Sequence, residues 1–146
     1  MSKNEPAREL SLKILSTRMA FRQSIQRVLK RNNVEMTFEM LQIMHRLWRT
    51  EGVSQQFLAE NTAKDKACMT NLINNLEKKD WVFRKEDPSD KRNRLIFLTD
   101  EGRKMADEVL PLINGIYTRI TEKMTARQIQ TALNHLSKLN NILDEI

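Results

Sequence analysis

The sequence predicts a mainly α-helical fold with one β-hairpin. Hydrophobic residues make up 40% and charged residues 30% of the 146 positions, and glycine and proline occur only three times each. This composition suits a helix-rich protein better than a β-sandwich or barrel. Apolar residues recur every three or four positions along most of the chain, and only two short stretches are rich in aromatic and branched residues. The length is typical of one domain, which we expect to span residues 1–146.

Hydrophobic spacing predicts four helices in the first part of the chain. The first covers residues 7–31, and the second covers residues 37–50 and stops before Gly52. A short third helix follows Ser54, which is a favourable N-cap, and the fourth covers residues 65–79. The apolar stripe of the first helix consists of Leu10, Ile14, Phe21, Ile25 and Val28.

The helix over residues 65–79 has two unlike faces. Its apolar arc, which we expect to face the core, consists of Met69, Leu72, Ile73 and Leu76. The opposite arc is small and rich in amides, and it consists of Ala67, Asn71, Asn74 and Lys78, flanked by Cys68, Thr70 and Asn75. Taken alone, this second face is either a solvated surface or a binding surface.

A β-hairpin is expected over residues 82–98. The stretches 81–85 and 94–98 have strand character, and the polar tip between them contains Pro88 and the charged run 90–92. Two strands alone are marginally stable, so the hairpin must pack against the neighbouring helices.

Two further helices are expected within residues 100–146. Thr99 is expected to cap the first, which can bend at Pro111, and Thr125 is expected to open the second. The second helix has a repeat that resembles a coiled-coil seam, formed by Ile129, Leu133, Leu136, Leu139, Leu143 and Ile146. The repeat could pack within the chain, but dimerisation is favoured because two helices beside one small domain have little else to bury against.

The basic charge is concentrated in two regions. The net charge is +6, with eight basic and two acidic residues in 1–31 and nine basic and six acidic residues in 64–94. This distribution favours an anionic partner. We assign the charge of the first helix to solubility of a half-buried helix rather than to contact with that partner.

Several classes of protein are excluded by what the sequence lacks. No apolar run approaches the roughly 20 residues that cross a bilayer, and the start has no apolar signal stretch, so we expect a cytoplasmic protein without a membrane partner. Cys68 has no partner for a disulfide and is expected to be a packing residue, and His45 and His135 suggest no metal site. No nucleophile–base pair or phosphate-binding glycine loop is visible, so we expect no enzyme, no cofactor and no metal.

Together, a short helix, a turn, a helix with an amide-rich face and a hairpin with a cationic tip predict a winged helix-turn-helix. The helix-turn-helix would cover residues 54–79 and the wing 82–98, within a unit spanning 37–99. Asparagine can pair with an adenine edge in the major groove, and the narrow minor groove favours arginine. The predicted DNA-contacting residues are Lys66, Ala67, Thr70, Asn71, Asn74, Lys91, Arg92 and Arg94.

At these residues the sequence resembles the multiple antibiotic resistance regulator (MarR) family, over nearly the whole chain. The most specific match is the wing run Asp87-Pro88-Ser89-Asp90-Lys91-Arg92, followed by Leu98-Thr99-Asp100-Glu101-Gly102. The helix-turn-helix half is shared with many other families. It matches at Leu58-Ala59-Glu60, Asp65, Thr70, Leu72-Ile73, Leu76-Glu77-Lys78-Lys79 and Trp81-Val82.

The resemblance implies a triangular homodimer in which the helices over residues 7–31 and 100–146 interlock. The predicted dimer contacts are Ile14, Phe21, Leu133, Leu136, Leu139 and Leu143. The resemblance also implies that Arg92 enters the minor groove and that Thr70 and Asn71 contact bases. Asp90 would stabilise the wing through an ion pair with a neighbouring arginine.

The implied function is that of a transcriptional regulator, most often a repressor, which binds a pseudo-palindromic operator and is released by a small, often phenolic or anionic effector. The sequence does not identify the effector or its site. Ala63 stands where the family commonly has glycine, and Asn71 stands where the family often has arginine. Asparagine favours adenine, whereas arginine favours guanine. The alternative is a sequence-indifferent architectural protein that binds nucleic acid through charge alone.

Overall fold

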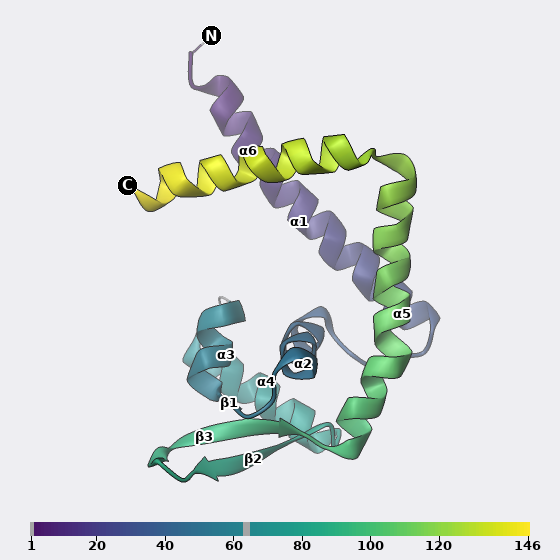
Figure 1. Cartoon of the computed structure of the whole chain (residues 1–146), viewed down its shortest axis with the longest axis vertical. Helices are drawn as coiled ribbons and strands as arrows, with labels where there is room; N and C mark the ends of the chain where they lie inside the picture. Colours follow the sequence, from purple (N-terminus) through teal and green to yellow (C-terminus); the bar gives the residue numbers. More distant parts are fainter. Residues whose placement is uncertain (1, 63–64) are drawn as a thin grey trace. The chain divides into compact units, whose positions relative to one another are not determined.

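The computed structural model describes residues 2–62 and 65–146, which form two compact units that divide within helix α5. The first unit extends to Leu112 and contains most of the elements (Figure 1). They are α1 (Glu5–Arg31), α2 (Phe38–Arg49), β1 (Val53–Ser54), α3 (Gln55–Thr62), α4 (Lys66–Lys78), β2 (Val82–Asp87), β3 (Asp90–Leu98) and the start of α5 (Asp100–Lys123). The second unit holds the rest of α5, which runs on beyond Pro111, and α6 (Ala126–Asp144). The predicted mainly helical fold is confirmed.

Five helices, including α5 after Thr99, begin where the sequence offers a capping side chain. The side-chain oxygens of Thr37, Ser54, Asp65 and Thr125 accept hydrogen bonds from the backbone N–H three residues later, at 3.1, 3.0, 2.7 and 3.1 Å. These bonds satisfy N–H groups that have no partner within the helix. The predicted helix starts therefore have a direct physical cause.

The core of the first unit lies between α2, α3 and α4 and the inner side of the hairpin. Met69, Ile73 and Leu76 of α4 have no exposed surface, and Ile96 of β3 is equally buried. Leu72, expected in the same arc, is half-buried. Because one face of α4 is fixed in the core, its opposite face points outward.

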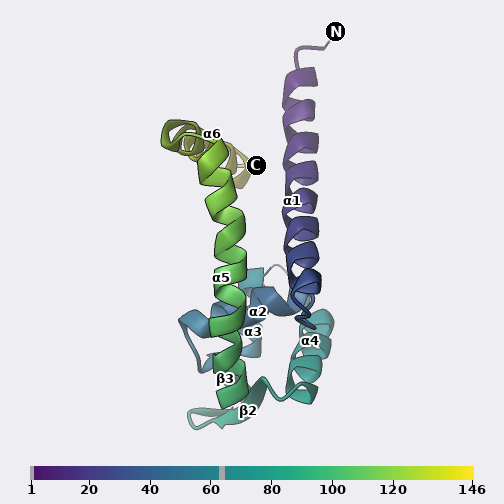
Figure 2. The ribbon, with the colours of Figure 1, turned by 90° about the vertical axis from the view of Figure 1, so that its right-hand side faces the viewer.

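Helix α1 joins this core only through its last turns. Ile25 and Leu29 are buried, and Arg22 forms an ion pair with Glu39 of α2 at 2.5 Å. The Arg22 guanidinium also lies 5.9 Å from the ring centroid of Phe38. The earlier turns of α1 are exposed and extend away from α2 and α4, as Figure 2 shows.

The sheet contains the predicted hairpin and one additional strand. Strands β2 and β3 pair antiparallel, and the rings of Phe83 and Phe97, which face each other in the register, stack 5.6 Å apart. Strand β1 pairs with the other edge of β3, with Val53 opposite Ile96. The prediction of two strands is right for the wing, but the sheet has a third strand because β1 covers an otherwise open edge of β3.

A close backbone contact joins the root of the wing to the start of α5. The N–H of Thr99 donates to the carbonyl of Trp81 at 3.0 Å, and the Thr99 hydroxyl accepts from the N–H of Gly102 at 3.0 Å. A Cβ atom at Gly102 would lie 2.0 Å from the Trp81 carbonyl oxygen. The indole N–H of Trp48 donates to the Gly102 carbonyl at 2.8 Å. Glycine is therefore required at this position by space.

Replacement of Gly102 by alanine is expected to destabilise the protein by about 1–3 kcal/mol, since the methyl group would push Trp81 and the wing root away from α5. Denaturant unfolding measures this loss. Gly115→Ala is the matched control, because nothing lies within 4 Å of a Cβ at Gly115. Because alanine favours the helix more than glycine does, Gly115→Ala should be neutral or should stabilise the protein by up to about 1 kcal/mol. Equal effects of the two substitutions would contradict the proposed contact.

Candidate nucleic-acid interface

Four of the predicted DNA-contacting residues on α4 are exposed, and three of them lie on its outer face. Lys66, Ala67, Asn71 and Asn74 are all exposed. Within the described part of the chain, neither Asn71 nor Asn74 has a side-chain hydrogen-bond partner. Each of the two amides can therefore offer a donor and an acceptor to a molecule that approaches this face, which is the pattern that an adenine edge complements.

Thr70 differs from these residues because its hydroxyl is already engaged. It is half-buried, donates to the carbonyl of Lys66 at 3.0 Å and accepts from the amide nitrogen of Gln55 at 2.7 Å. A hydroxyl has one proton and two lone pairs, so the hydroxyl of Thr70 retains one lone pair. Thr70 can accept a hydrogen bond from a base without losing either contact, but it cannot donate one.

The wing tip presents its cations to solvent. Lys91 is exposed, and the side chain of Arg92 is 94% exposed. The carboxylate of Asp90 accepts from the backbone N–H of Arg92 at 3.0 Å and lies 3.6 Å from the Arg92 Nε. Arg94 lies 3.8 Å from Glu86 across the hairpin. Asp90 is thus paired with a neighbouring arginine, and its role in stabilising the wing stays a prediction.

The turn of the hairpin is held by Asp87. Its carboxylate accepts from the hydroxyl of Ser89 at 2.7 Å and from the Ser89 backbone N–H at 2.9 Å. These hydrogen bonds, the one from the hydroxyl first, lower the pKa of Asp87 below its ordinary value. The ionised carboxylate is the form that accepts both hydrogen bonds, and these bonds hold the turn that precedes Lys91 and Arg92.

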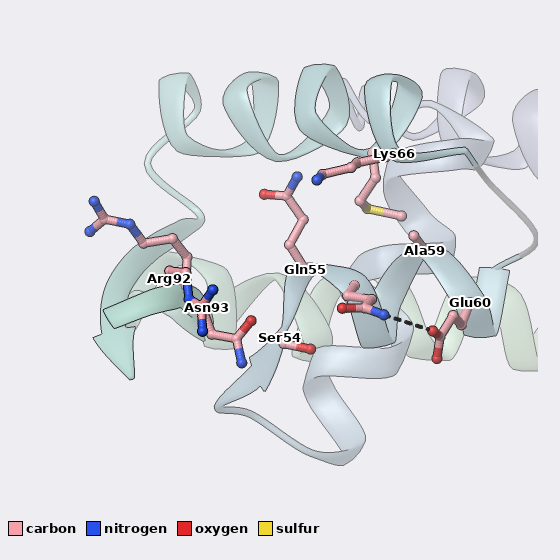
Figure 3. A pocket seen from close by; sticks show the side chains of 10 residues that line it. Ser54, Gln55, Ala59, Glu60, Lys66, Arg92 and Asn93 are labelled. Atoms are coloured by element: carbon pink, nitrogen blue, oxygen red, sulfur yellow. Dashed lines mark hydrogen bonds between the residues drawn. The ribbon is translucent and has the colours of Figure 1, made fainter. Parts of the chain in front are cut away.

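A cavity of about 510 Å³ lies between α3, the first turns of α4 and the wing. Figure 3 shows Gln55 extending from α3 toward α4, near the side chain of Lys66, with Arg92 on the wing side. The charged residues that line the cavity are three cations and Glu60. The net positive charge suits an anionic occupant such as a phosphate backbone. The lining residues are Ser54, Gln55, Gln56, Ala59, Glu60, Lys66, Met69, Arg92, Asn93 and Arg94.

Three residues at this interface were missed by the sequence analysis. Gln55, Glu77 and Arg84 link α3, α4 and β2 through polar contacts. No pattern in the sequence signals them, because they come from three elements and polar residues are ordinary at each position. The motif positions Asp65 and Gly102 were detectable because each has a fixed local role.

Ala63 lies outside the described residues, and Cys68 is a half-buried free thiol. Over residues 2–62 and 65–146, no group of three or more histidine, cysteine, aspartate or glutamate residues could hold a metal ion. In the same ranges, no helix combines the length and apolar character needed to span a membrane.

Comparison with known proteins agrees with this geometry. Residues 37–93 match the family model described as "MarR family". The transcriptional regulator HosA of Escherichia coli O111:H- is 23% identical over 107 residues, which cover 73% of this chain and 79% of HosA. The curated relatives that match are named as transcriptional regulators and not as enzymes.

Solved structures share the fold. A cysteine-to-serine mutant of MarR from E. coli, solved with operator DNA, superposes with a TM-score of 0.83 at 19% identity, over 95% of this chain and 99% of that one. NadR in complex with 4-hydroxyphenylacetate gives a TM-score of 0.74 at 22% identity, over 89% and 91% of the two chains. Residues 37–93 thus match the MarR family model, and the described residues share the winged helix-turn-helix fold of these solved structures.

Proposed function

We propose that this chain binds double-stranded DNA as a homodimer at a pseudo-palindromic operator, and that it represses transcription until a small molecule releases it. The observation that carries the proposal is the unpaired amide face of α4 beside the cationic wing tip. Asn71 and Asn74 would contact bases in the major groove, while Arg92 would enter the minor groove. The MarR mutant solved with operator DNA shares this fold and supports DNA binding by it.

The charges around the cavity fit this proposal. Lys66 stands at the first turn of α4, and Arg92 and Arg94 stand across from it on the wing. A DNA strand running between the recognition helix and the wing would bring phosphates toward these cations and release counterions. The positive end of the α4 dipole favours a phosphate at the same place.

The homodimer is supported by apolar surface that the single chain leaves exposed. Ile14 and Phe21 of α1 are 38% and 39% exposed, and α6 has no buried residue. Leu133, Leu136 and Leu143 of α6 are 52%, 41% and 55% exposed, and Leu139 is half-buried. Apolar stripes of this kind mark protein interfaces, and a second copy of the same chain brings an identical pair of stripes.

Repression and release are proposed by analogy with the family. The complex of NadR with 4-hydroxyphenylacetate supports a small-molecule effector. A ligand releases DNA only if it binds the form of the dimer that fits DNA less well, so its effect is a coupling between two sites. The effector of this chain would thus change the separation of the two α4 helices.

Selection from a pool of random duplex DNA at roughly physiological salt is expected to enrich a palindrome with half-sites about 10 base pairs apart. Arg92→Ala should weaken binding to the selected duplex, because its contact with the minor groove is lost. Arg127→Ala is the matched control, since it removes the same charge from α6 and should leave affinity nearly unchanged.

The same selection separates the proposal from the architectural alternative. Asn71→Ala should relax the preference at one base pair of each half-site, while Lys91→Ala should weaken binding to all sequences alike. If no motif is enriched and affinity merely falls with salt, the protein is the sequence-indifferent binder instead.

Leu136→Glu is expected to convert the dimer to monomers at micromolar concentration, because it places a charge in the apolar seam. Sedimentation velocity measures this change. Asn141→Glu introduces the same charge on the opposite side of α6, and it should leave the dimer intact. A monomeric wild-type protein, or equal behaviour of the two variants, would refute the proposed interface.

A phenolic acid is expected to displace the selected duplex from the protein. Titration of 4-hydroxyphenylacetate, followed by other small phenolic and anionic compounds, into a fluorescent protein–DNA complex measures the displacement. At least one compound should raise the Kd for DNA at least fivefold, the lower end of typical coupling between sites. An unchanged Kd across the panel would argue against release by this class of effector.

A further inference from the structure

Four polar side chains form a cluster behind the outer face of α4. We call Gln55, Thr70, Glu77 and Arg84 the Gln55 cluster. Gln55 begins α3, Thr70 and Glu77 lie on α4, and Arg84 lies on β2 of the wing. The cluster thus connects the three elements of the proposed DNA-binding surface.

The amide of Gln55 is the centre of the cluster. Its nitrogen donates to the hydroxyl of Thr70 at 2.7 Å, and its oxygen accepts from the guanidinium of Arg84 at 3.4 Å. The same guanidinium forms an ion pair with Glu77. One uncharged side chain therefore joins a residue on the recognition helix to a residue on the wing.

The cluster holds α4 at two points along its length. Thr70 lies in the first half of α4 and Glu77 in the last turn, and the chain of contacts from Arg84 reaches both. The side chains of Arg84 and Glu77 are only 23% and 34% exposed, so water competes weakly for these contacts. Rotation of α4 about its axis, or movement of the wing away from it, would break at least one of them.

The cluster also fixes the hydroxyl of Thr70. Its proton is directed to the carbonyl of Lys66, and Gln55 occupies one lone pair. The hydroxyl therefore meets the DNA as an acceptor, and it can recognise the amino groups of adenine or cytosine but not the carbonyls of guanine or thymine.

We propose that Gln55 is a positioning residue for sequence recognition, which orients Thr70 and sets the placement of α4 relative to the wing. This inference rests on the proposed function, since it assumes that α4 contacts bases. Gln55 acts through Thr70 and Arg84, and this role requires no direct contact between its own amide and the DNA.

The neighbouring Gln56 provides a matched control. Gln56 is also a glutamine of α3 that lines the cavity, but its amide nitrogen donates to Glu60 within the same helix at 3.2 Å. It makes no contact of this kind with α4 or the wing in the described residues. Replacement of either glutamine by methionine removes an amide and keeps the length of the side chain.

The test measures the Kd of the wild-type protein, Gln55→Met and Gln56→Met for the selected duplex and for a scrambled duplex of the same composition. Gln55→Met should reduce the preference for the selected duplex roughly tenfold, as expected for the loss of two hydrogen bonds. Its affinity for the scrambled duplex and its salt dependence should stay the same, because no cation is removed. Gln56→Met should keep the wild-type preference, because any contact of Gln56 with a phosphate in the cavity would change the Kd for both duplexes alike.

Two further variants exclude a merely structural role. Gln55→Glu keeps an acceptor for Arg84 but has no N–H for Thr70. Its preference for the selected duplex should fall roughly threefold. Thr70→Val combined with Gln55→Met should lose less than the product of the two single losses, because both substitutions break the same bond. Thermal unfolding of each variant reports stability, which a structural role would lower together with both affinities.

The outcomes separate this inference from the proposed function. A wild-type protein that does not distinguish the two duplexes would overturn the proposed function and this inference with it. A wild-type preference that survives in Gln55→Met, or that falls equally in Gln56→Met, would overturn only the role of Gln55. Equal loss of affinity for both duplexes with a lower Tm would assign Gln55 to stability alone.

Discussion

The backbone contact between Trp81 and the first turn of α5 determines where the wing stands. The chain leaves α4, enters the hairpin at Trp81 and returns to the same point at Thr99, where α5 begins. Glycine at position 102 lets the two backbones approach. Glu51 adds to this junction, since it accepts from the N–H of Leu98 at 2.9 Å and pairs with Arg103 of α5 at 3.1 Å. The root of the wing is therefore held by the Trp81–Thr99 backbone contact and by the contacts of Glu51 with Leu98 and α5.

Two kinds of interaction determine the position of helix α4. Burial of Met69, Ile73 and Leu76 sets the depth of α4 and determines which face points outward, but apolar burial is non-directional and opposes a small rotation only weakly. The directional contacts of the Gln55 cluster oppose that rotation. A surface that must match the edges of base pairs needs both, because small displacements of a side chain change the hydrogen bonds that it can form.

The helices and the hairpin could be predicted from the sequence because each has its own period and its own capping or turn residues. Strand β1 could not, since its two residues are too short to show any period. The outward face of α4 followed from its buried face by simple geometry. The Gln55 cluster did not follow, because its members lie up to 29 residues apart and meet only after folding. For Thr70, the sequence indicated its place on α4, whereas the partner that limits its hydroxyl comes from α3.

The wing tip combines a fixed backbone with an exposed arginine side chain that is held only by a long ion pair of 3.6 Å to Asp90. Asp90 holds the N–H of Arg92, while the Arg92 side chain remains 94% exposed. The free protein thus keeps the rotamer entropy of this arginine, which is about 2 kcal/mol, and loses much of it only when the side chain enters a groove. The loss of this rotamer entropy would offset part of the electrostatic attraction between Arg92 and a narrow groove. In the proposed complex the wing would therefore be a tolerant anchor with a modest net contribution to affinity. Discrimination between operators would fall to α4, where hydrogen bonds already orient the hydroxyl of Thr70.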